Sequence, residues 1–479
     1  MHNPRLFLAG VGFFSKSGLL PWDSARPPDL PQSLLGRAYK GSFTNKIAKQ
    51  HPSRQKYQKK QWHGRPRDDS WQERLADVVT PLWRLSYEEQ LKMKFEAQKK
   101  ILQSLESYLH MLRGVSGTVA APQSEGLHCL LHPIIPSPTT TGYRNKSTFA
   151  VNRGPDGNPK TVGYYLGSWR DGNVVCVPCN HLKNIPEKHS QVAQEELCVQ
   201  KVTLKDFFTK GPGTVCGLTS LYFQESTMTR CRHQQAPYQL LFGEPHIFED
   251  LLGLKIRISP DAFFQINTAG AEMLYRTIGE LSRVNPESTL LDICCGTGVI
   301  GLSLAQRASQ VHGIELVEQA VEDARWTAAF NGVTNCEFHA GRAETILPQL
   351  LKSPKDEKLT VAVANPARAG LHYRVVQAIR NCRAIRTLVF VSCKPQGESM
   401  RNFIELCCPP NSAKKLLGDP FVLREAVPVD LFPHTPHCEL VLLFTRDLHG
   451  RGGGNIVRAR GSKWLQRNKL SQPEENPES

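Results

Sequence analysis

The sequence predicts an α/β fold: a doubly wound sheet on the C-terminal side, preceded by a smaller β-rich central domain and an N-terminal helix. From about residue 250, apolar segments of strand length alternate with segments of helical pattern. Such alternation indicates a parallel sheet with helices on both faces. A glycine-rich turn at residues 292–301 follows the first of these strands, at the position where open α/β sheets bind ligands. Residues 129–250 instead carry short strand-like runs between turn signals.

The composition is that of a globular protein with a basic excess. The 479 residues include 40% hydrophobic and 22% charged residues, and the net charge is +15. No apolar run reaches 18 residues, which excludes a membrane-spanning helix and predicts no membrane insertion. The excess charge favours a polyanionic partner, an anionic membrane surface or a targeting signal. Of the +15, residues 1–70 contribute +9, residues 447–479 contribute +2 and the body only +4.

The N-terminal region separates into a basic arm and a helix. Residues 1–70 are rich in Pro, Lys and Gln, and their first acidic residue is Asp23. This pattern predicts an unstructured mitochondrial presequence, with a disordered basic arm as the alternative. Apolar residues between 85 and 112 recur at mostly three- and four-residue steps, which predicts a helix in an N-terminal helical segment at 80–128.

The central domain, residues 129–250, is expected to be built from short strands. A strong turn signal at 152–157 lies between the apolar runs 147–151 and 161–166. Arg144 and Lys146 flank these strands and are candidate RNA contacts through phosphate groups. A solvated strand face is the alternative explanation.

The Cys176–Cys179 pair is a lone CxxC motif. A structural zinc site needs two further ligands, usually a second pair at suitable spacing. No second pair at such a spacing follows in this sequence. We therefore expect free thiols, and the sequence predicts no metal site.

The C-terminal domain, residues 251–446, carries the predicted sheet, and the tail 447–479 is expected to be disordered. The expected strands are 290–293, 311–314, 359–364, 387–392 and 438–445, and the expected helices run to about 308, over 317–330 and near 371–380. The glycine-rich turn begins with Asp292, and Glu315 ends the next strand, where an acid can bind ribose hydroxyls. Because the glycines also satisfy GxGxxG, a dinucleotide is a competing ligand. The acid before the glycines and the Asn365-Pro turn after a later strand favour S-adenosylmethionine and a class I methyltransferase fold.

Two residues near strand ends are candidates for the chemistry. Cys393 follows the strand 387–392, in a loop that opens toward the ligand crevice of such sheets. The neighbouring Lys394 would favour a nucleophilic thiolate. Glu439 begins the last strand close to His434 and His437, where a partly desolvated carboxylate can act as a general base. A buried structural cysteine and a solvated glutamate are the alternatives.

These motifs together resemble the RNA uracil-5-methyltransferase family over about residues 80–446. The matching segments are 143–146, 259–267, 292–298, 365–368, 392–395 and 434–439. The resemblance implies Cys393 as nucleophile and Glu439 as proton acceptor. It also implies that Gln265, Glu315 and Asn365 contact S-adenosylmethionine.

The resemblance also implies the substrate and the setting. The expected target is the T-loop uridine of tRNA (position 54), with a mitochondrial rRNA uridine as the second candidate. The expected enzyme is a monomeric tRNA (uracil-5-)-methyltransferase that forms 5-methyluridine in the mitochondrial matrix. RNA cytosine-5-methyltransferases carry a Cys just after the proline of the 365–368 motif, and Ala367 stands there instead.

Three departures from the family pattern keep an alternative open. Asn365 replaces an Asp, Lys394 replaces an Asn, and the central domain looks short after residue 193, where residues 194–198 lead into a helical stretch. A catalytically weak or inactive RNA-binding or tRNA-folding protein on the same fold is therefore one alternative. A methyltransferase for a small molecule or a protein is the other.

Overall fold

The computed structural model describes residues 70–113, 127–159, 161–168, 172–187, 189, 210, 219–224, 237–352 and 359–446. The predicted presequence, the tail expected to be disordered and the helical stretch expected after residue 194 lie outside these residues.

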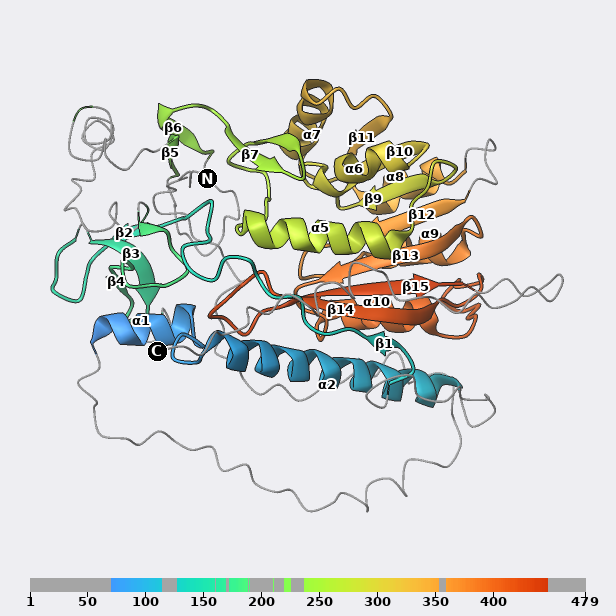
Figure 1. The fold of residues 1–479 in the computed structure, drawn as a ribbon, viewed down its shortest axis with the longest axis horizontal. Coiled ribbons are helices and arrows are strands. Elements are labelled where there is room, and N and C mark those ends of the chain that lie inside the picture. Colours follow the sequence, from blue (N-terminus) through green and yellow to red (C-terminus); the bar gives the residue numbers. More distant parts are fainter. Residues whose placement is uncertain are drawn as a thin grey trace, which may run out of the picture.

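An eight-stranded sheet forms the centre of the molecule (Figure 1). Its strands follow the order β1-β14-β15-β13-β12-β9-β10-β11. Their bounds are β1 Leu130–Leu131, β9 Thr289–Ile293, β10 Gln310–Glu315, β11 Cys336–Ala340, β12 Thr360–Ala364, β13 Ile385–Ser392, β14 Val422–Val429 and β15 Glu439–Thr445. The predicted doubly wound sheet is thereby confirmed, and the order reverses direction between β9 and β12, where such sheets bind ligands.

The expectation of a uniformly parallel sheet is wrong at one strand. β15 is antiparallel to both of its neighbours, β13 and β14. Only residues 430–438 connect β14 to β15, and a connection this short allows an antiparallel pair, whereas a parallel pair needs a crossover of a dozen or more residues. As a result, the N-terminal end of β15 lies beside the C-terminal end of β13.

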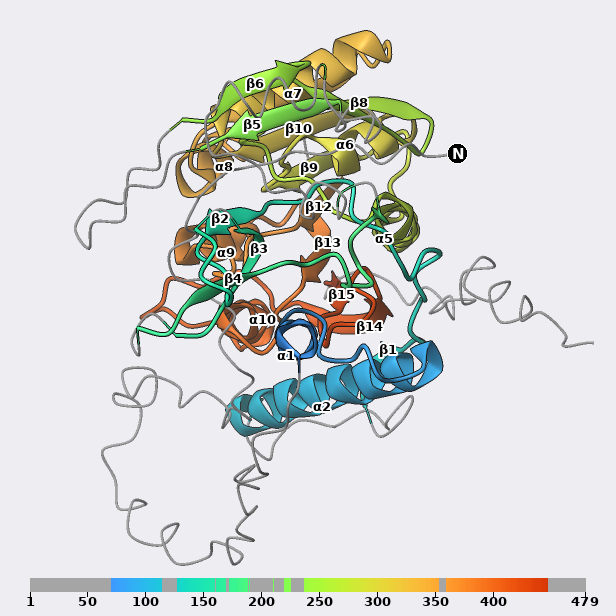
Figure 2. The ribbon, with the colours of Figure 1, turned by 90° about the vertical axis from the view of Figure 1, so that its left-hand side faces the viewer.

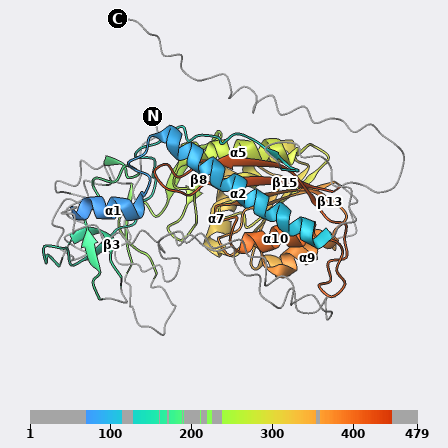
Figure 3. The same cartoon turned by 90° about the horizontal axis from the view of Figure 1, so that it is seen from below.

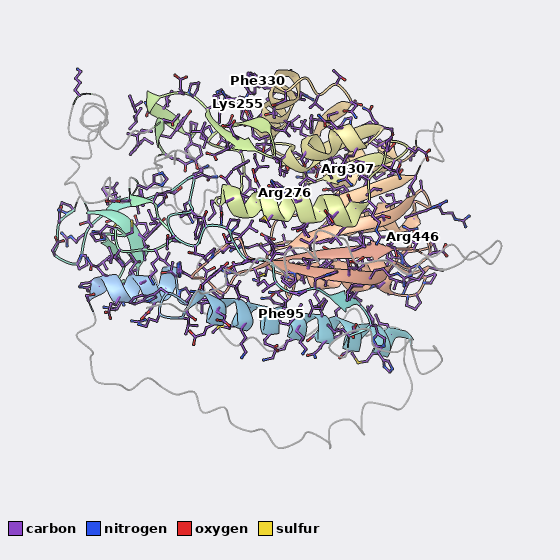
Figure 4. The ribbon with its side chains drawn as sticks, viewed as in Figure 1. Phe95, Lys255, Arg276, Arg307, Phe330 and Arg446 are labelled. Atoms are coloured by element: carbon purple, nitrogen blue, oxygen red, sulfur yellow. The ribbon has the colours of Figure 1, made fainter. Side chains whose placement is uncertain are left out.

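Helices cover both faces of the sheet, because its central strands are apolar on both sides. One face packs against α5 Thr268–Ser282, α6 Val299–Leu304 and α7 Glu318–Phe330. The other packs against α2 Tyr87–Arg113, α8 Ala343–Leu350, α9 Tyr373–Asn381 and α10 Glu398–Cys407. Helix α2 runs alongside α10 (Figure 3), and its Phe95 is partly buried against this face (Figure 4). Within the described part of the chain, every helix is too short or too polar to cross a membrane.

The central domain is small and rich in β structure, as predicted (Figure 2). It contains the three-stranded sheet β2-β3-β4, and the turn at 152–157 joins β2 to β3 as an antiparallel pair. Two antiparallel pairs, β5–β6 and β7–β8, precede the first strand of the large sheet's main run, β9. The bounds are β2 Ala150–Asn152, β3 Thr161–Leu166, β4 Val175–Val177, β5 Ser220–Phe223, β6 Gln239–Gly243, β7 Ile247–Leu251 and β8 Leu254–Ile258.

A short helix and two buried thiols complete the core of this domain. The helix α1 Trp71–Val79, which the sequence did not predict, packs Leu75 and Ala76 into the core. Cys176 and Cys179 are both buried and form no disulfide bond among the described residues. Burial raises the pKa of the Cys176 thiol to about 12, so this thiol remains protonated at neutral pH.

Candidate active site

The glycine-rich turn after β9 presents its backbone at the carboxyl edge of the sheet. Cys294, Gly296 and Gly298 all have positive φ, at 64°, 56° and 74°. A Cβ on Gly298 would lie 2.7 Å from the Phe338 ring, so both the backbone conformation and the packing require glycine there. The turn leaves open backbone against which a ligand can pack closely.

Two carboxylates organise this turn. The Gly301 N–H donates to Asp292 Oδ2 over 2.8 Å at the start of α6. Asp292 Oδ1 is buried and has no hydrogen-bond partner among the described residues. Burial raises the pKa of Asp292 to about 7. Glu315, at the end of β10, accepts from the Gly296 and Val317 N–H groups, each over 3.0 Å. These bonds fix the Glu315 carboxylate beside the turn.

The surroundings of the turn suit a nucleoside with a polar chain. The side chains of Phe263 and Leu316 are 69% and 65% exposed, although both are large and apolar. The Phe263 backbone oxygen lies 3.6 Å from the Cβ position of Gly296, and Leu316 follows Glu315 directly. An adenosine group could cover such apolar side chains while Glu315 accepts from its ribose hydroxyls, so the residues present fit S-adenosylmethionine.

The other predicted cofactor residues, Gln265 and Asn365, lie on loops at this edge of the sheet. Asn365 directly follows β12, is half-buried, and donates its N–H to the Ile293 carbonyl over 3.2 Å. Gln265 lies between β8 and α5 and is 4% exposed. The order of strands therefore brings Asn365 next to the glycine-rich turn, because β12 and β9 are neighbours in register.

Cys393 and Glu439 lie beside each other, although 46 positions separate them in the sequence. In the antiparallel pair β13–β15, Ser392 is opposite Leu440, so the next residue along β13 is opposite Glu439. Cys393 is half-buried in the turn after β13, while Glu439 is only 4% exposed. The antiparallel direction of β15 therefore brings together the two residues that the sequence analysis names as candidate nucleophile and base.

Arg368 provides the positive charge of this pair. It forms a hydrogen bond to Cys393 and acts electrostatically on both Cys393 and Glu439. Burial raises the pKa of Glu439 to about 7, and the charge of Arg368 opposes this rise. Burial, and next the charge of Glu439, also raise the pKa of the Cys393 thiol above its ordinary value, again against Arg368. The guanidinium thus favours both anions that the predicted chemistry needs.

Helix α2 holds the loop 430–438 that leads into Glu439. Lys94 Nζ donates to Asp430 Oδ1 over 2.7 Å, and both side chains are completely buried. The Tyr87 hydroxyl donates to Asp430 Oδ2 over 3.0 Å. His434, at φ 67°, donates its backbone N–H to Gln90 Oε1 over 2.7 Å. We refer to Tyr87, Gln90, Lys94, Asp430 and His434 as the α2 clamp, which fixes the backbone just before the predicted base.

The predicted RNA contacts Arg144 and Lys146 lie where the central domain meets the methyltransferase domain. Lys146 Nζ donates to the Pro260 carbonyl over 2.9 Å, and burial lowers its pKa to about 8. Asn145 Nδ2 donates to the Gln265 carbonyl over 2.9 Å. The segment 143–146 therefore fastens the loop that carries Gln265, and an RNA-binding role for Arg144 and Lys146 stays a prediction.

Sequence reasoning assigned no role to Arg368 or to the α2 clamp. Arg368 ends the 365–368 motif. A positive charge within a motif expected at the active site could have suggested that Arg368 stabilises the Cys393 thiolate. The contact between Lys94 and Asp430 in the α2 clamp could not be predicted from the sequence. The two residues are 336 positions apart, and each is an ordinary charged residue in its own segment.

Comparisons with known proteins show similarity to methyltransferases. Residues 285–410 match a family model described as a methyltransferase domain. The chain is 80% identical to tRNA (uracil-5-)-methyltransferase homolog B of Mus musculus, over 93% of this chain and all of the relative. It is 39% identical to homolog A of Homo sapiens, over 80% of this chain and 69% of that protein. The solved tRNA (uracil-54, C5)-methyltransferase of Pyrococcus abyssi superposes with a TM-score of 0.52, at 23% identity over 77% of this chain and 84% of that one, and shares the fold.

Proposed function

The chain belongs to the tRNA (uracil-5-)-methyltransferase family, and we propose that it methylates uracil C5 in tRNA through a covalent bond between Cys393 and C6 of the base. The enzyme class, the methyltransferase fold and the S-adenosylmethionine cofactor follow from the similarities above. The adduct mechanism, the nucleotide and the cellular compartment are our proposals. The single observation that carries the mechanism is the placement of Cys393 beside Glu439 with Arg368 acting on both.

The glycine-rich turn would hold the methyl donor. Glu315 would accept from ribose hydroxyls, and Gln265 and Asn365 would contact the rest of the molecule at the same edge of the sheet. When bound, S-adenosylmethionine supplies a methyl group on a positively charged sulfur. The role of the protein is then to make C5 of uracil, a poor nucleophile, electron-rich enough to take it.

Cys393 supplies that activation. Its thiolate forms a bond to C6, and the electron pair of the C5–C6 double bond moves toward C5 and the C4 carbonyl. C5 can then take the methyl group, while the electron pair of the broken methyl–sulfur bond stays on the sulfur of the donor. The Glu439 carboxylate then removes the C5 proton. The electrons of that C–H bond restore the double bond as the bond from C6 to Cys393 breaks and the thiolate returns. Arg368 favours the anionic forms of both residues throughout.

We further propose the T-loop uridine at position 54 as the target and the mitochondrial matrix as the compartment. A uridine within folded tRNA has to be flipped out of its stack to reach such a pocket. The support for the matrix is the N-terminal arm, which carries +9 over residues 1–70 and no acid before Asp23. A mitochondrial rRNA uridine is the second candidate substrate. Import of a fluorescent fusion carrying residues 1–70 is the test of the compartment, and purely cytosolic fluorescence would refute it.

The mechanism is tested with tRNA that contains 5-fluorouracil. Fluorine in place of the C5 hydrogen cannot leave as a proton, so the adduct should persist on a denaturing gel in the presence of the donor. Cys393→Ala should abolish it, while Cys382→Ala, which changes another half-buried thiol, should keep it. Glu439→Gln should trap an adduct even on ordinary tRNA, because the C5 proton then stays in place. A stable adduct in Cys393→Ala would overturn the assignment.

Asn365 favours one competing function. An amide at this position lacks the charge that the family pattern carries there, and a non-catalytic RNA-binding protein would need no such charge. Hydrogen bonds to charged groups are stronger by roughly 1 kcal/mol, so Asn365→Asp should raise turnover about fivefold in an active enzyme. RNA binding without any adduct, in both the wild type and Asn365→Asp, would instead support the non-catalytic protein.

A further inference from the structure

A second group of side chains with lone-pair donors lies at the edge of the sheet, away from Cys393 and Glu439. It consists of His312 on β10 and of Glu337 and His339 on the edge strand β11. His312 is the register partner of Glu337 in this parallel pair, and His339 lies two residues further along β11. Because side chains alternate along a strand, all three project from the same face of the sheet.

The donor atoms are spaced as the ligands of one metal ion. His312 Nδ1 lies 3.4 Å from His339 Nε2 and 3.5 Å from Glu337 Oε2. His339 Nε2 lies 3.8 Å from Glu337 Oε1. In a tetrahedral zinc site with bonds of about 2.0–2.1 Å, ligand atoms are separated by roughly 3.3–3.4 Å. The two imidazole nitrogens lie close to that spacing, each faces a different oxygen of Glu337, and one ligand atom from each residue lies within 4.8 Å of the others.

The surroundings leave room for a further ligand. A cavity of about 650 Å³ adjoins the group and is lined by Glu337 and His339 together with Ile346 and Gln349 of α8. The two imidazoles are 21–22% exposed, and Glu337 is 59% exposed. Water entering from the cavity can occupy a fourth position.

We propose that His312, Glu337 and His339 form a zinc-binding site that ties the edge strand β11 to β10. The donor set of two imidazoles and one carboxylate suits zinc. The site is independent of the methyl transfer proposed above. Glu315 lies three residues after His312, and its register partner Ala340 ends β11. A bound ion would therefore stabilise the strand pair that carries the ribose-binding carboxylate.

The test uses the full-length protein without a histidine tag, titrated with Zn²⁺ by calorimetry and with Co²⁺ by absorption. We expect one equivalent with visible bands typical of nitrogen and oxygen ligands, without the near-ultraviolet band of cobalt thiolates. His312→Gln and His339→Gln should lose this equivalent. His128→Gln should keep it, because His128 forms only a single pair with Glu106 at 3.3 Å. Glu337→Gln, at an exposed position, should weaken binding at least tenfold.

Thermal melting separates metal binding from effects on folding. Without metal, in EDTA, the wild type and Glu337→Gln should melt at the same temperature. At Zn²⁺ one hundred times the wild-type Kd, the wild type should gain roughly 5 °C or more, and Glu337→Gln should gain about half as much or less. Equal Zn²⁺ affinity in the wild type and Glu337→Gln would overturn the proposal. So would the absence of any bound equivalent, or a cobalt spectrum dominated by thiolate.

Discussion

Replacing Lys94 by Met should cost this protein about 3–5 kcal/mol of folding free energy. Lys94 and Asp430 have completely buried side chains 2.7 Å apart, and Met keeps the volume of Lys while removing its charge. Removing one partner of a buried ion pair leaves the other charge without compensation, which typically costs this amount. Asp430 keeps its bonds from the Tyr87 hydroxyl and the Phe432 N–H, both at 3.0 Å, so we expect a value near 3 kcal/mol.

Urea unfolding is the assay, and Lys92→Met is the matched control. Lys92 lies on the same helix but is exposed, so its replacement should change stability by less than about 0.5 kcal/mol. The double variant Lys94→Met/Asp430→Leu should recover much of the loss, because no buried charge remains. Its turnover should still be reduced, since the loop before Glu439 has lost its tie to α2. A loss below 1 kcal/mol in Lys94→Met, equal to that of the control, would refute this reasoning.

Three further predictions concern the active site and its loop. Turnover should increase with pH through about 7 and beyond, since it needs both anions and burial raises the pKa of both Glu439 and Cys393; Arg368→Gln should shift this profile to higher pH, and an unshifted profile would count against Arg368. Glu439→Gln should stabilise the protein by about 3 kcal/mol above pH 7, because the unfolded state ionises more readily than the native one, and the gain should vanish below about pH 4.5; urea unfolding at two pH values measures it. Gly298→Ala should cost about 2–4 kcal/mol, since φ is 74° and the new Cβ would meet Phe338 at 2.7 Å; a normal unfolding midpoint would contradict this.

The large sheet was predictable because its signals are local. The strand at 289–293, the glycine-rich turn and the helix after it follow one another directly in the sequence, so periodicity and turn chemistry suffice to place Asp292 and Glu315. The strands β11 and β14 were missed. β11 mixes polar and apolar residues because it is an edge strand with His339 and Glu337 on one face, and such a strand lacks the apolar run by which the others are recognised.

The direction of β15 and the α2 clamp could not be predicted from local pattern. An apolar strand carries no mark of whether it runs parallel or antiparallel, and here the short connection at 430–438 decides. Cys393 and Glu439 lie close together only because β15 runs in that direction. The sequence could therefore identify both residues as candidates but could not show that they are neighbours. Arg368 likewise acts on Cys393 and Glu439 only because the fold places its loop beside these two residues.

The α2 clamp also has a consequence for the time at which the enzyme becomes active. Lys94 leaves the ribosome 336 residues before Asp430, and Gln90 leaves it 344 residues before His434. Contacts over such separations form late, because the chain between them has to be ordered first. Helix α2 is therefore synthesised long before the loop 430–438 that it contacts. A chain that stops before residue 430 lacks both the loop and Glu439, so such a prematurely terminated product should be an inactive protein in which Lys94 of α2 has no partner loop.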